Sequence, residues 1–256
     1  IGFDINNQRI DSLNQGHDET LEISKSELKK AKSLSFTSDK NFLTQSNIYI
    51  VTVPTPIDKF KRPNLDPLIK ASRMIGEFLS IGDLVIYEST VYPGVTSQTW
   101  MPIIEELGLT IGEDLEIAYC PERFNPGDPA HGVRQVARVI GCENPAVGEE
   151  LVQLYSKLTS EDVRYVGKLE VAEAAKVIEN VQRDINIALV NELARIFPAL
   201  DVDVEDVLSA AATKWNFHRY TPGVGVGGHC IPVDPYYLIQ KARAAGAPVD
   251  LITSAR

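Results

Sequence analysis

The sequence predicts an α/β protein: a doubly wound, largely parallel, Rossmann-like sheet followed by a domain organised around a long helix. Short apolar runs of strand length alternate with helical segments between residues 48 and 167, which is typical of a parallel sheet with crossover helices. From residue 169 to 197 apolar residues then recur at helical spacing almost without interruption. We therefore expect one domain over residues 1–168 and a second over residues 169–256.

The elements follow in order. Ile1 to Asp4 read as the end of a buried strand, a helix is expected over residues 7–13, and the lysine-rich stretch 15–46 predicts one or two short helices. Buried strands are predicted over residues 48–53, 84–90, 115–120, 136–142 and 163–167. Helices are predicted over residues 67–79, 96–107, 145–158, 169–197, 204–212 and 236–245.

Composition narrows the class of protein. The 256 residues are 44% apolar and 23% charged, which is ordinary for a globular protein. The net charge of −10, without a basic stripe, argues against a nucleic-acid partner. Neither a membrane-length apolar run nor a basic-then-apolar leader is visible, so we expect no membrane partner. The three cysteines form no CxxC pair, so we expect no metal site, and their odd number favours a reducing cytoplasm.

A glycine-rich stretch over residues 215–238 combines features of a reactive centre. Its thiol is Cys230, its acid is Asp234, and the preceding glycines are Gly223, Gly225, Gly227 and Gly228. Glycines permit positive φ angles and let backbone N–H groups approach a ligand closely. Oriented amides favour a thiolate, and an acid four residues later could steer a proton or a water. The alternative is a surface loop with a buried structural cysteine.

Polar or rigid residues also follow the predicted strands, where ligands of a doubly wound sheet bind. Asp4 could accept a hydrogen bond from a ribose 2′-OH, and Arg9 could lie over an adenine face. The next strand ends carry Pro54, Thr55, Ser89, Thr90, Glu122, Arg123 and Asn125. Ordinary turn chemistry is the alternative at each of these ends taken alone.

The predicted long helix contributes a second polar group. Glu173, Lys176 and Asn180 fall at helical spacing and therefore share one face. A solvated stripe with a Glu173–Lys176 pair is one interpretation. The apolar surroundings favour the other, in which the lysine and the amide face a crevice and stabilise a developing oxyanion. Arg183 and Asp184 lie one turn further on and are expected only to form structural pairs.

Five motifs in order resemble the nucleotide-sugar 6-dehydrogenases, over essentially all of residues 1–256. Within that family the chain is most similar to the UDP-N-acetylhexosamine 6-dehydrogenases. The motifs are VPTP (53–56), ESTVYPG (88–94), CPERFNPGD (120–128), AEAAKVIENVQRDINIALVNEL (172–193) and GVGGHCIPVDPYYL (225–238). Each motif alone is weak, and their ordered combination is specific.

The resemblance implies an NAD-dependent, four-electron oxidation of the C6 alcohol of a UDP-N-acetylhexosamine to a carboxylate, for surface polysaccharide precursors. By this analogy Cys230 captures the C6 aldehyde as a thiohemiacetal, and a second hydride transfer leaves a thioester that water cleaves. Lys176 and Asn180 match oxyanion-stabilising positions, and Asp234 matches the acid that orients or deprotonates water. Thr90 and Glu122 match catalytic positions beside the nicotinamide.

The resemblance also implies binding residues and a partner. Contacts with NAD are expected at Asp4, Arg9, Pro54, Thr55, Ser89, Thr90 and Glu122. Contacts with the UDP-sugar are expected at Arg123, Phe124, Asn125, Lys176, Asn180, Trp215, Phe217, Tyr220, Gly223, Gly225, Gly227 and Gly228. The apolar helix over residues 169–197 predicts a homodimer.

Two departures from the family pattern matter. UDP-glucose dehydrogenases usually carry a second glutamate where this chain has Pro126, which makes UDP-glucose a less expected substrate. The family's first strand and its glycine-rich phosphate turn would precede Ile1, and its UDP-binding domain would lie beyond Arg256. We therefore expect a natural protein that extends beyond both ends of this sequence, by roughly two dozen residues or more at the first.

Other functions remain as alternatives. A UDP-glucose 6-dehydrogenase shares the whole chemistry, whereas a two-electron hydroxyacid or 6-phosphogluconate-type dehydrogenase would not need Cys230. A non-enzymatic alternative is a dimerising binding fragment in which the thiol is part of the core. A cysteine hydrolase is disfavoured, because a histidine that merely adjoins Cys230 in sequence does not create a catalytic pair.

Overall fold

The computed structural model describes residues 1–124, 127–228 and 230–256. Two compact units share this chain. The first unit holds residues 1–54, 66–89 and 94–172, and the second holds residues 55–65, 90–93 and 173–256. Within the described residues, no helix combines the length and the apolar character needed to cross a membrane.

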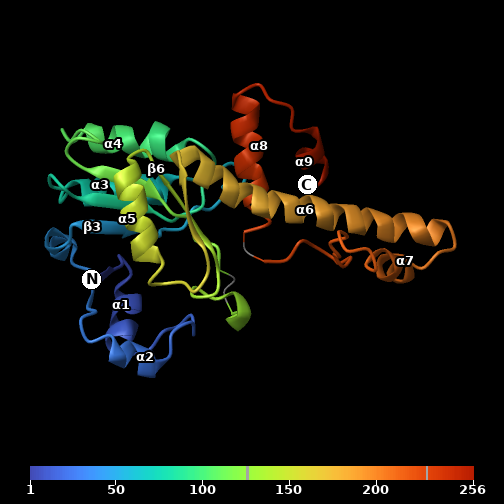
Figure 1. The fold of residues 1–256 in the computed structure, drawn as a ribbon, viewed down its shortest axis with the longest axis horizontal. Helices are drawn as coiled ribbons and strands as arrows, with labels where there is room; N and C mark the ends of the chain where they lie inside the picture. The colour runs from blue at the N-terminus through green and yellow to red at the C-terminus, as the bar shows by residue number, and fades with distance from the viewer. Residues whose placement is uncertain (125–126, 229) are drawn as a thin grey trace. The chain divides into compact units, whose positions relative to one another are not determined.

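The first unit is built on a five-stranded sheet in the order β3-β4-β5-β6-β7. Figure 1 labels β3 and β6 of this sheet. Its strands are β3 (Ile48–Val51), β4 (Leu84–Tyr87), β5 (Glu116–Tyr119), β6 (Arg138–Cys142) and β7 (Val163–Gly167). Neighbouring strands are parallel except for β5 and β6, which pair antiparallel with Ala118 opposite Cys142. The prediction of a largely parallel Rossmann-like sheet is confirmed, with β6 as the reversed strand.

A separate two-stranded parallel sheet joins β1 (Gly2–Phe3) to β2 (Phe36–Thr37). The predicted first strand is therefore present, but its two residues are half-buried instead of buried. The prediction that residues 48–53 form a buried strand is also wrong in part, because Ile48 and Ile50 are exposed and only their neighbours are buried. An alternating pattern of this kind is typical of a strand with one covered face.

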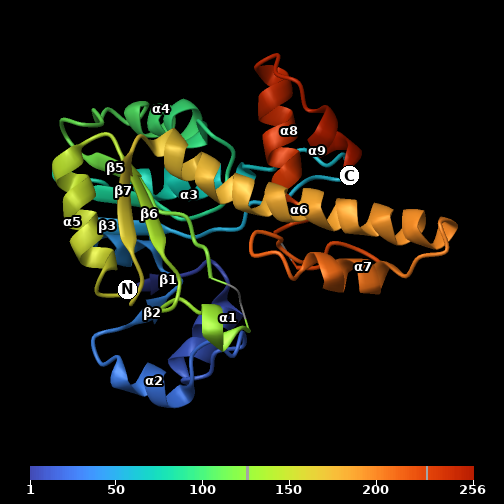
Figure 2. The same ribbon diagram turned by 45° about the vertical axis from the view of Figure 1, so that its right-hand side comes forward.

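Helices alternate with these strands along the chain. The first unit holds α1 (Asn7–Asn14), α2 (Lys25–Lys30), α3 (Asp66–Gly76), α4 (Met101–Glu105) and α5 (Pro145–Tyr155). The predicted single helix over residues 96–107 is instead a π-helical turn, Thr96–Trp100, followed by α4. α5 begins where the Asn144 side chain accepts a hydrogen bond from the Ala146 N–H at 3.1 Å, and it packs on β6 and β7 (Figure 2).

The second unit is organised along α6 (Leu169–Ala199), a 31-residue helix that begins in the first unit. It also contains α7 (Val204–Ala211), α8 (Asp234–Ala244) and α9 (Asp250–Ser254), of which the last was not predicted. Tyr237 of α8 is fully buried, and its hydroxyl donates to the backbone oxygen of Thr55 at 2.8 Å. This bond ties the segment 55–65 to α8 inside the second unit.

Candidate active site

α6 carries a row of buried polar side chains at a spacing of three and four residues. Glu173, Asn180 and Asp184 are 0% exposed and Lys176 is 7% exposed. The interpretation of this face as a solvated stripe is therefore wrong. Burying charged groups costs free energy unless they are paired. The polar groups on this face of α6 are therefore expected to be paired within the protein or to bind a ligand.

Asn180 is joined to Asp234, the first residue of α8. The amide Nδ2 of Asn180 donates to Oδ2 of Asp234, which is 2% exposed. The N–H groups of a helix start favour a carboxylate at this position. The backbone N–H of Asp234 donates to the carbonyl oxygen of Cys230 at 2.9 Å, so one turn links the predicted nucleophile to the predicted acid.

The three cysteines lie in two different environments. Cys120 and Cys142 belong to the core of the first unit, where burial raises the pKa of their thiols to about 12 and about 11. Cys230 is half-buried in the second unit. Because the core thiols are protonated and enclosed, Cys230 is the cysteine whose surroundings permit attack on a substrate.

Only some glycines of the glycine-rich loop have the positive φ angles that the sequence analysis allows for them. Gly227 and Gly228 have φ angles of +67° and +69°, whereas Gly223 and Gly225 are outside the positive-φ region. The N–H of Gly223 donates to Oδ1 of Asn191 on α6 at 2.8 Å. Residues 225–228 are followed by position 229, which lies outside the described residues.

Aromatic residues before this loop border a pocket of about 230 Å³ in the second unit. The predicted substrate residues Phe217 and Tyr220 line it together with Gln182, Asn186, Leu189, Val190, Leu193, Asn216 and His218. The side chain of Trp215 is 92% exposed, and Trp215 is not among the residues that line the pocket. Two of the three predicted aromatic substrate residues therefore line one cavity, together with residues of α6.

Two predicted residues at strand ends belong to the second unit. The hydroxyl of Thr55 donates to the backbone oxygen of Thr90 at 2.7 Å, so the two segments 55–65 and 90–93 are joined. Both residues are half-buried.

In the first unit, hydrogen bonds tie the ends of three neighbouring strands. The hydroxyl of Ser89 donates to the backbone oxygen of Val53 at 2.7 Å, and the hydroxyl of Tyr119 donates to the backbone oxygen of Ser89 at 3.0 Å. Pro54, at the end of β3, is exposed. The predicted side-chain contact of Ser89 with a cofactor would have to replace or share its bond to Val53.

The segment after β5 is held by its own polar groups. The carboxylate of Glu122 accepts from the N–H of Phe124, and Nη1 of Arg123 donates to the backbone oxygen of Ala137 at 2.9 Å. Glu122, Arg123 and Phe124 are all half-buried. The predicted substrate residue Asn125 lies outside the described residues.

Asp4 and Arg9 are the residues predicted to bind the adenosine end of NAD. Asp4 is exposed, and its carboxylate accepts from the N–H of Asn6 at 2.8 Å. Arg9 donates to Asp18 at 2.6 Å. Burial alone would raise the pKa of Asp18, but hydrogen bonds from the Ile23 N–H, Arg9 and Thr20 hold this pKa well below its ordinary value. Arg9 therefore forms an ion pair with the buried Asp18, which the sequence pattern did not predict.

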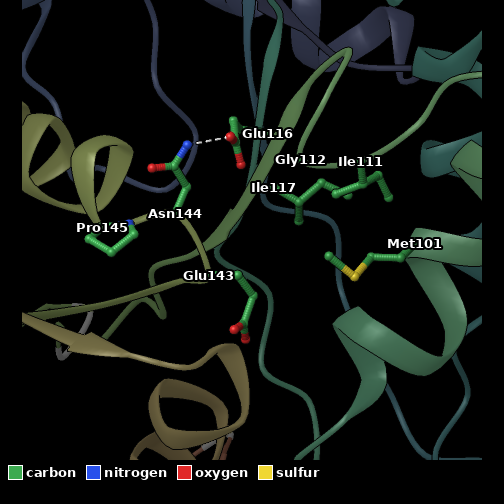
Figure 3. Close-up of a pocket in the computed structure, with 8 residues that line it drawn as sticks. All are labelled: Met101, Ile111, Gly112, Glu116, Ile117, Glu143, Asn144 and Pro145. Carbon is green, nitrogen blue, oxygen red and sulfur yellow. Dashed lines mark hydrogen bonds between the residues drawn. The ribbon is translucent and has the colours of Figure 1, made fainter.

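A larger pocket, of about 410 Å³, lies in the first unit and contains none of the predicted residues (Figure 3). Nδ2 of Asn144 donates to Oε1 of Glu116 at 2.5 Å beside it. Its lining is Met101, Ile111, Gly112, Glu116, Ile117, Glu143, Asn144 and Pro145. Glu116 opens β5, so this pocket lies at the opposite edge of the sheet from the end of β5 that leads to Glu122.

Two charged contacts on α6 complete the site. Arg183 donates to Oδ1 of Asn180, and Arg256 donates to Oδ1 of Asp184. Burial raises the pKa of Asp184, and the neighbouring Arg256 opposes this rise. Helical spacing placed Arg183 and Asp184 near the site, and only the structure identifies their partners. In the described part of the chain, His, Cys, Asp and Glu side chains form no cluster of three or more that could hold a metal ion.

The parallel sheet and the family model that it matches define the class: proteins with an NAD binding domain. Residues 1–159 match the NAD binding domain of the UDP-glucose/GDP-mannose dehydrogenase family, and residues 170–256 match its central domain. The chain belongs to this family, and the predictions of the family and of NAD as cofactor are confirmed.

Several known proteins are similar to the chain along its whole length. It is 51% identical over 257 residues to UDP-N-acetyl-D-glucosamine 6-dehydrogenase of Pseudomonas aeruginosa, covering 100% of this chain and 61% of that protein. It is 47% identical to the Salmonella typhi protein of the same name, covering 100% and 60%. The structure of UDP-D-ManNAc dehydrogenase from Pyrococcus horikoshii superposes with a TM-score of 0.90 at 35% identity, covering 99% and 60%. The chain thus spans about 60% of the length of these relatives.

Proposed function

We propose that the protein oxidises the C6 alcohol of a UDP-N-acetylhexosamine to the carboxylate in two NAD-dependent steps, as a cytoplasmic supplier of surface polysaccharide precursors. The observation that carries this proposal is the buried row on α6, with Asn180 bonded to Asp234 one turn from Cys230. Similarity to enzymes named UDP-N-acetyl-D-glucosamine 6-dehydrogenase supports the substrate class.

In this proposal the residues of the second unit share the chemistry at C6. The thiolate of Cys230 adds to the C6 aldehyde, so a C–S bond forms and the carbonyl oxygen becomes an oxyanion. Lys176 and the amide of Asn180 donate to that oxyanion, and a buried setting strengthens such donors. Asp234 orients the water that cleaves the C–S bond of the thioester, which returns the thiol and releases the carboxylate.

Two features of the first unit support a dinucleotide site in this proposal. The carboxylate of Asp4 is exposed at the end of β1, and the ends of β3, β4 and β5 meet at one edge of the sheet, where such ligands bind. When bound, NAD would accept a hydride, which is two electrons and one proton, from C6 in each oxidation step, and the hydroxyl proton would pass to solvent. We assign Asp4 to the adenosine ribose and Glu122 to the reacting end.

The remaining contacts of the proposal concern the sugar nucleotide and a second copy of the chain. Phe217 and Tyr220 contact the sugar nucleotide, and the glycines of the loop offer it backbone N–H groups. The exposed apolar residues of α6 form the interface of a homodimer.

The full-length protein, given a panel of UDP-N-acetylhexosamines and UDP-glucose, should form two NADH per sugar consumed. A ratio of one would identify a two-electron dehydrogenase and contradict the proposal. Cys230→Ser should abolish the second oxidation, since the thioester cannot form. A two-electron enzyme would retain its activity in this variant.

A matched control separates catalysis from folding. Cys142→Ser changes a core thiol that the proposal does not use, and any folded Cys142→Ser protein should keep the ratio of two NADH per sugar. The UDP-sugar should also slow the alkylation of Cys230 in the parent protein. Alkylation that is indifferent to the UDP-sugar, together with no NADH, would favour a binding fragment.

A further inference from the structure

The amide of Asn180 lies between two charged side chains whose hydrogen-bonding roles are fixed. Arg183, three residues further along α6, donates to Oδ1, and Nδ2 donates to Oδ2 of Asp234. A guanidinium has only donors and an ionised carboxylate has only acceptors. Of the two amide orientations, which differ by exchange of oxygen and nitrogen, only one therefore satisfies both neighbours.

Packing alone does not choose between these orientations, because the oxygen and the NH₂ group of an amide have nearly the same size. In the reversed orientation, oxygen would face the carboxylate of Asp234 and NH₂ would face the guanidinium of Arg183. Asn180 is 0% exposed and Asp234 is 2% exposed, so water could not separate the amide oxygen from the carboxylate, and unsatisfied buried groups are costly. Arg183 therefore opposes the reversed orientation from the side away from Asp234.

We propose that Arg183 is a positioning residue, which keeps the NH₂ group of Asn180 turned toward Asp234 and the reacting carbon. This inference rests on the proposed function, in which Asn180 donates to an oxyanion. The second hydrogen of Nδ2 is the donor that serves the oxyanion, whereas a reversed amide would present an oxygen to it. Loss of one such donor costs about 10²–10³ in kcat.

Arg183 can be changed without opening the core, because its side chain is exposed although its partner is buried. Arg183→Met removes the donors and keeps much of the apolar stem. Arg183→Lys restores a donor at the end of a flexible chain. Arg195, also exposed and also on α6, provides the matched control in Arg195→Met, which makes the same change of charge.

Steady-state kinetics of the full-length variants form the first readout. We expect Arg183→Met to lower kcat by roughly tenfold or more, because Asp234 alone then opposes the reversed amide and part of the protein holds it. KM should change by less than about twofold, since binding of the ground state does not use the oxyanion donors. Arg183→Lys should recover most of the loss, and Arg195→Met should match the parent protein. Unchanged kcat in Arg183→Met would overturn the proposal.

Neutron diffraction, which distinguishes Nδ2 from Oδ1, provides a readout independent of turnover. The parent protein should show one orientation and Arg183→Met a mixture of two. A single, unchanged orientation in Arg183→Met overturns the role of Arg183, whatever the kinetics. If the parent and Arg195→Met form no NADH from any UDP-sugar, the proposed function fails, and the diffraction result still decides what Arg183 does.

Discussion

The difference between Cys230 and the other two cysteines is the residue-scale feature with the most direct chemical consequence. Burial raises the pKa of Cys120 to about 12 and of Cys142 to about 11, so both are almost wholly protonated near neutral pH. Cys230 is half-buried at the start of the turn that leads to α8. Access and thiolate fraction together decide thiol reactivity.

Iodoacetamide at pH 8 should therefore label the folded protein once per chain, at Cys230. At that pH the thiolate fraction is about 10⁻³ for Cys142 and about 10⁻⁴ for Cys120, and both are also shielded. Peptide mass spectrometry locates the label. Urea-unfolded protein, with all three thiols modified, is the control, and rapid labelling of either core cysteine in the folded state would contradict the assignment.

Residue spacing was sufficient to predict the shared face of Lys176 and Asn180, because helical periodicity places such residues without knowledge of the fold. The Arg9–Asp18 pair, the Arg183–Asn180 bond and the Arg256–Asp184 bond were not predictable. Each depends on where the guanidinium at the end of a long, flexible side chain finds an acceptor. Local sequence does not encode that choice.

At the scale of elements, α5 approaches β7 more closely than two side chains would allow. A Cβ on Gly148 would lie 2.3 Å from Cε2 of Tyr165, and the Tyr165 hydroxyl is anchored by donation to the backbone oxygen of Cys142 at 2.8 Å. The glycine thus sits inside a helix because of the contact with the sheet, in spite of its poor helix propensity.

Gly148→Ala should consequently destabilise the protein, although alanine gains about 1 kcal/mol of helix propensity. Overpacking costs about 1–3 kcal/mol and outweighs that gain, because the anchored ring cannot move aside. Gly76→Ala in α3 is the matched control, since its added Cβ meets only the end of the exposed Leu107 side chain. Denaturant unfolding should rank Gly148→Ala below Gly76→Ala, and the reverse order would contradict this account.

Most elements were predictable because apolar periodicity and capping residues are local signals, as in α5 and α6. The reversed direction of β6 and the pairing of Phe36–Thr37 with β1 were not. Strand direction and pairing depend on partners that are distant in sequence, and a two-residue strand is too short to show a period.

For the molecule as a whole, the exposed side of α6 is the feature that bears on assembly. Ile178 and Ile196 are 55% and 43% exposed. Their separation of 18 residues, five helical turns, keeps them on one side of the helix. A row of exposed apolar side chains of this kind marks an interaction surface, which supports the proposed homodimer.

The double substitution Ile178→Glu and Ile196→Glu should convert the proposed dimer of the full-length protein into monomers, because charges on both sides of a two-fold contact repel one another. Light scattering coupled to size-exclusion chromatography measures the mass. Leu154→Glu on α5, where the leucine is 42% exposed, introduces the same charge away from α6 and should leave the mass unchanged. A monomeric parent protein at micromolar concentration would contradict the dimer.

Because β6 is reversed, functional groups and a pocket lie at opposite ends of the strands of the first unit. Because β6 runs against β5, the connection into α5 returns to the edge where β5 begins, beside Glu116, while Glu122 follows the other end of the strand. Four strand residues separate these edges by roughly 13 Å. A fluorescent reporter or an affinity handle coupled near the exposed Glu143 would therefore leave clear the edge proposed for the dinucleotide, which makes this connection a practical place for immobilising the protein.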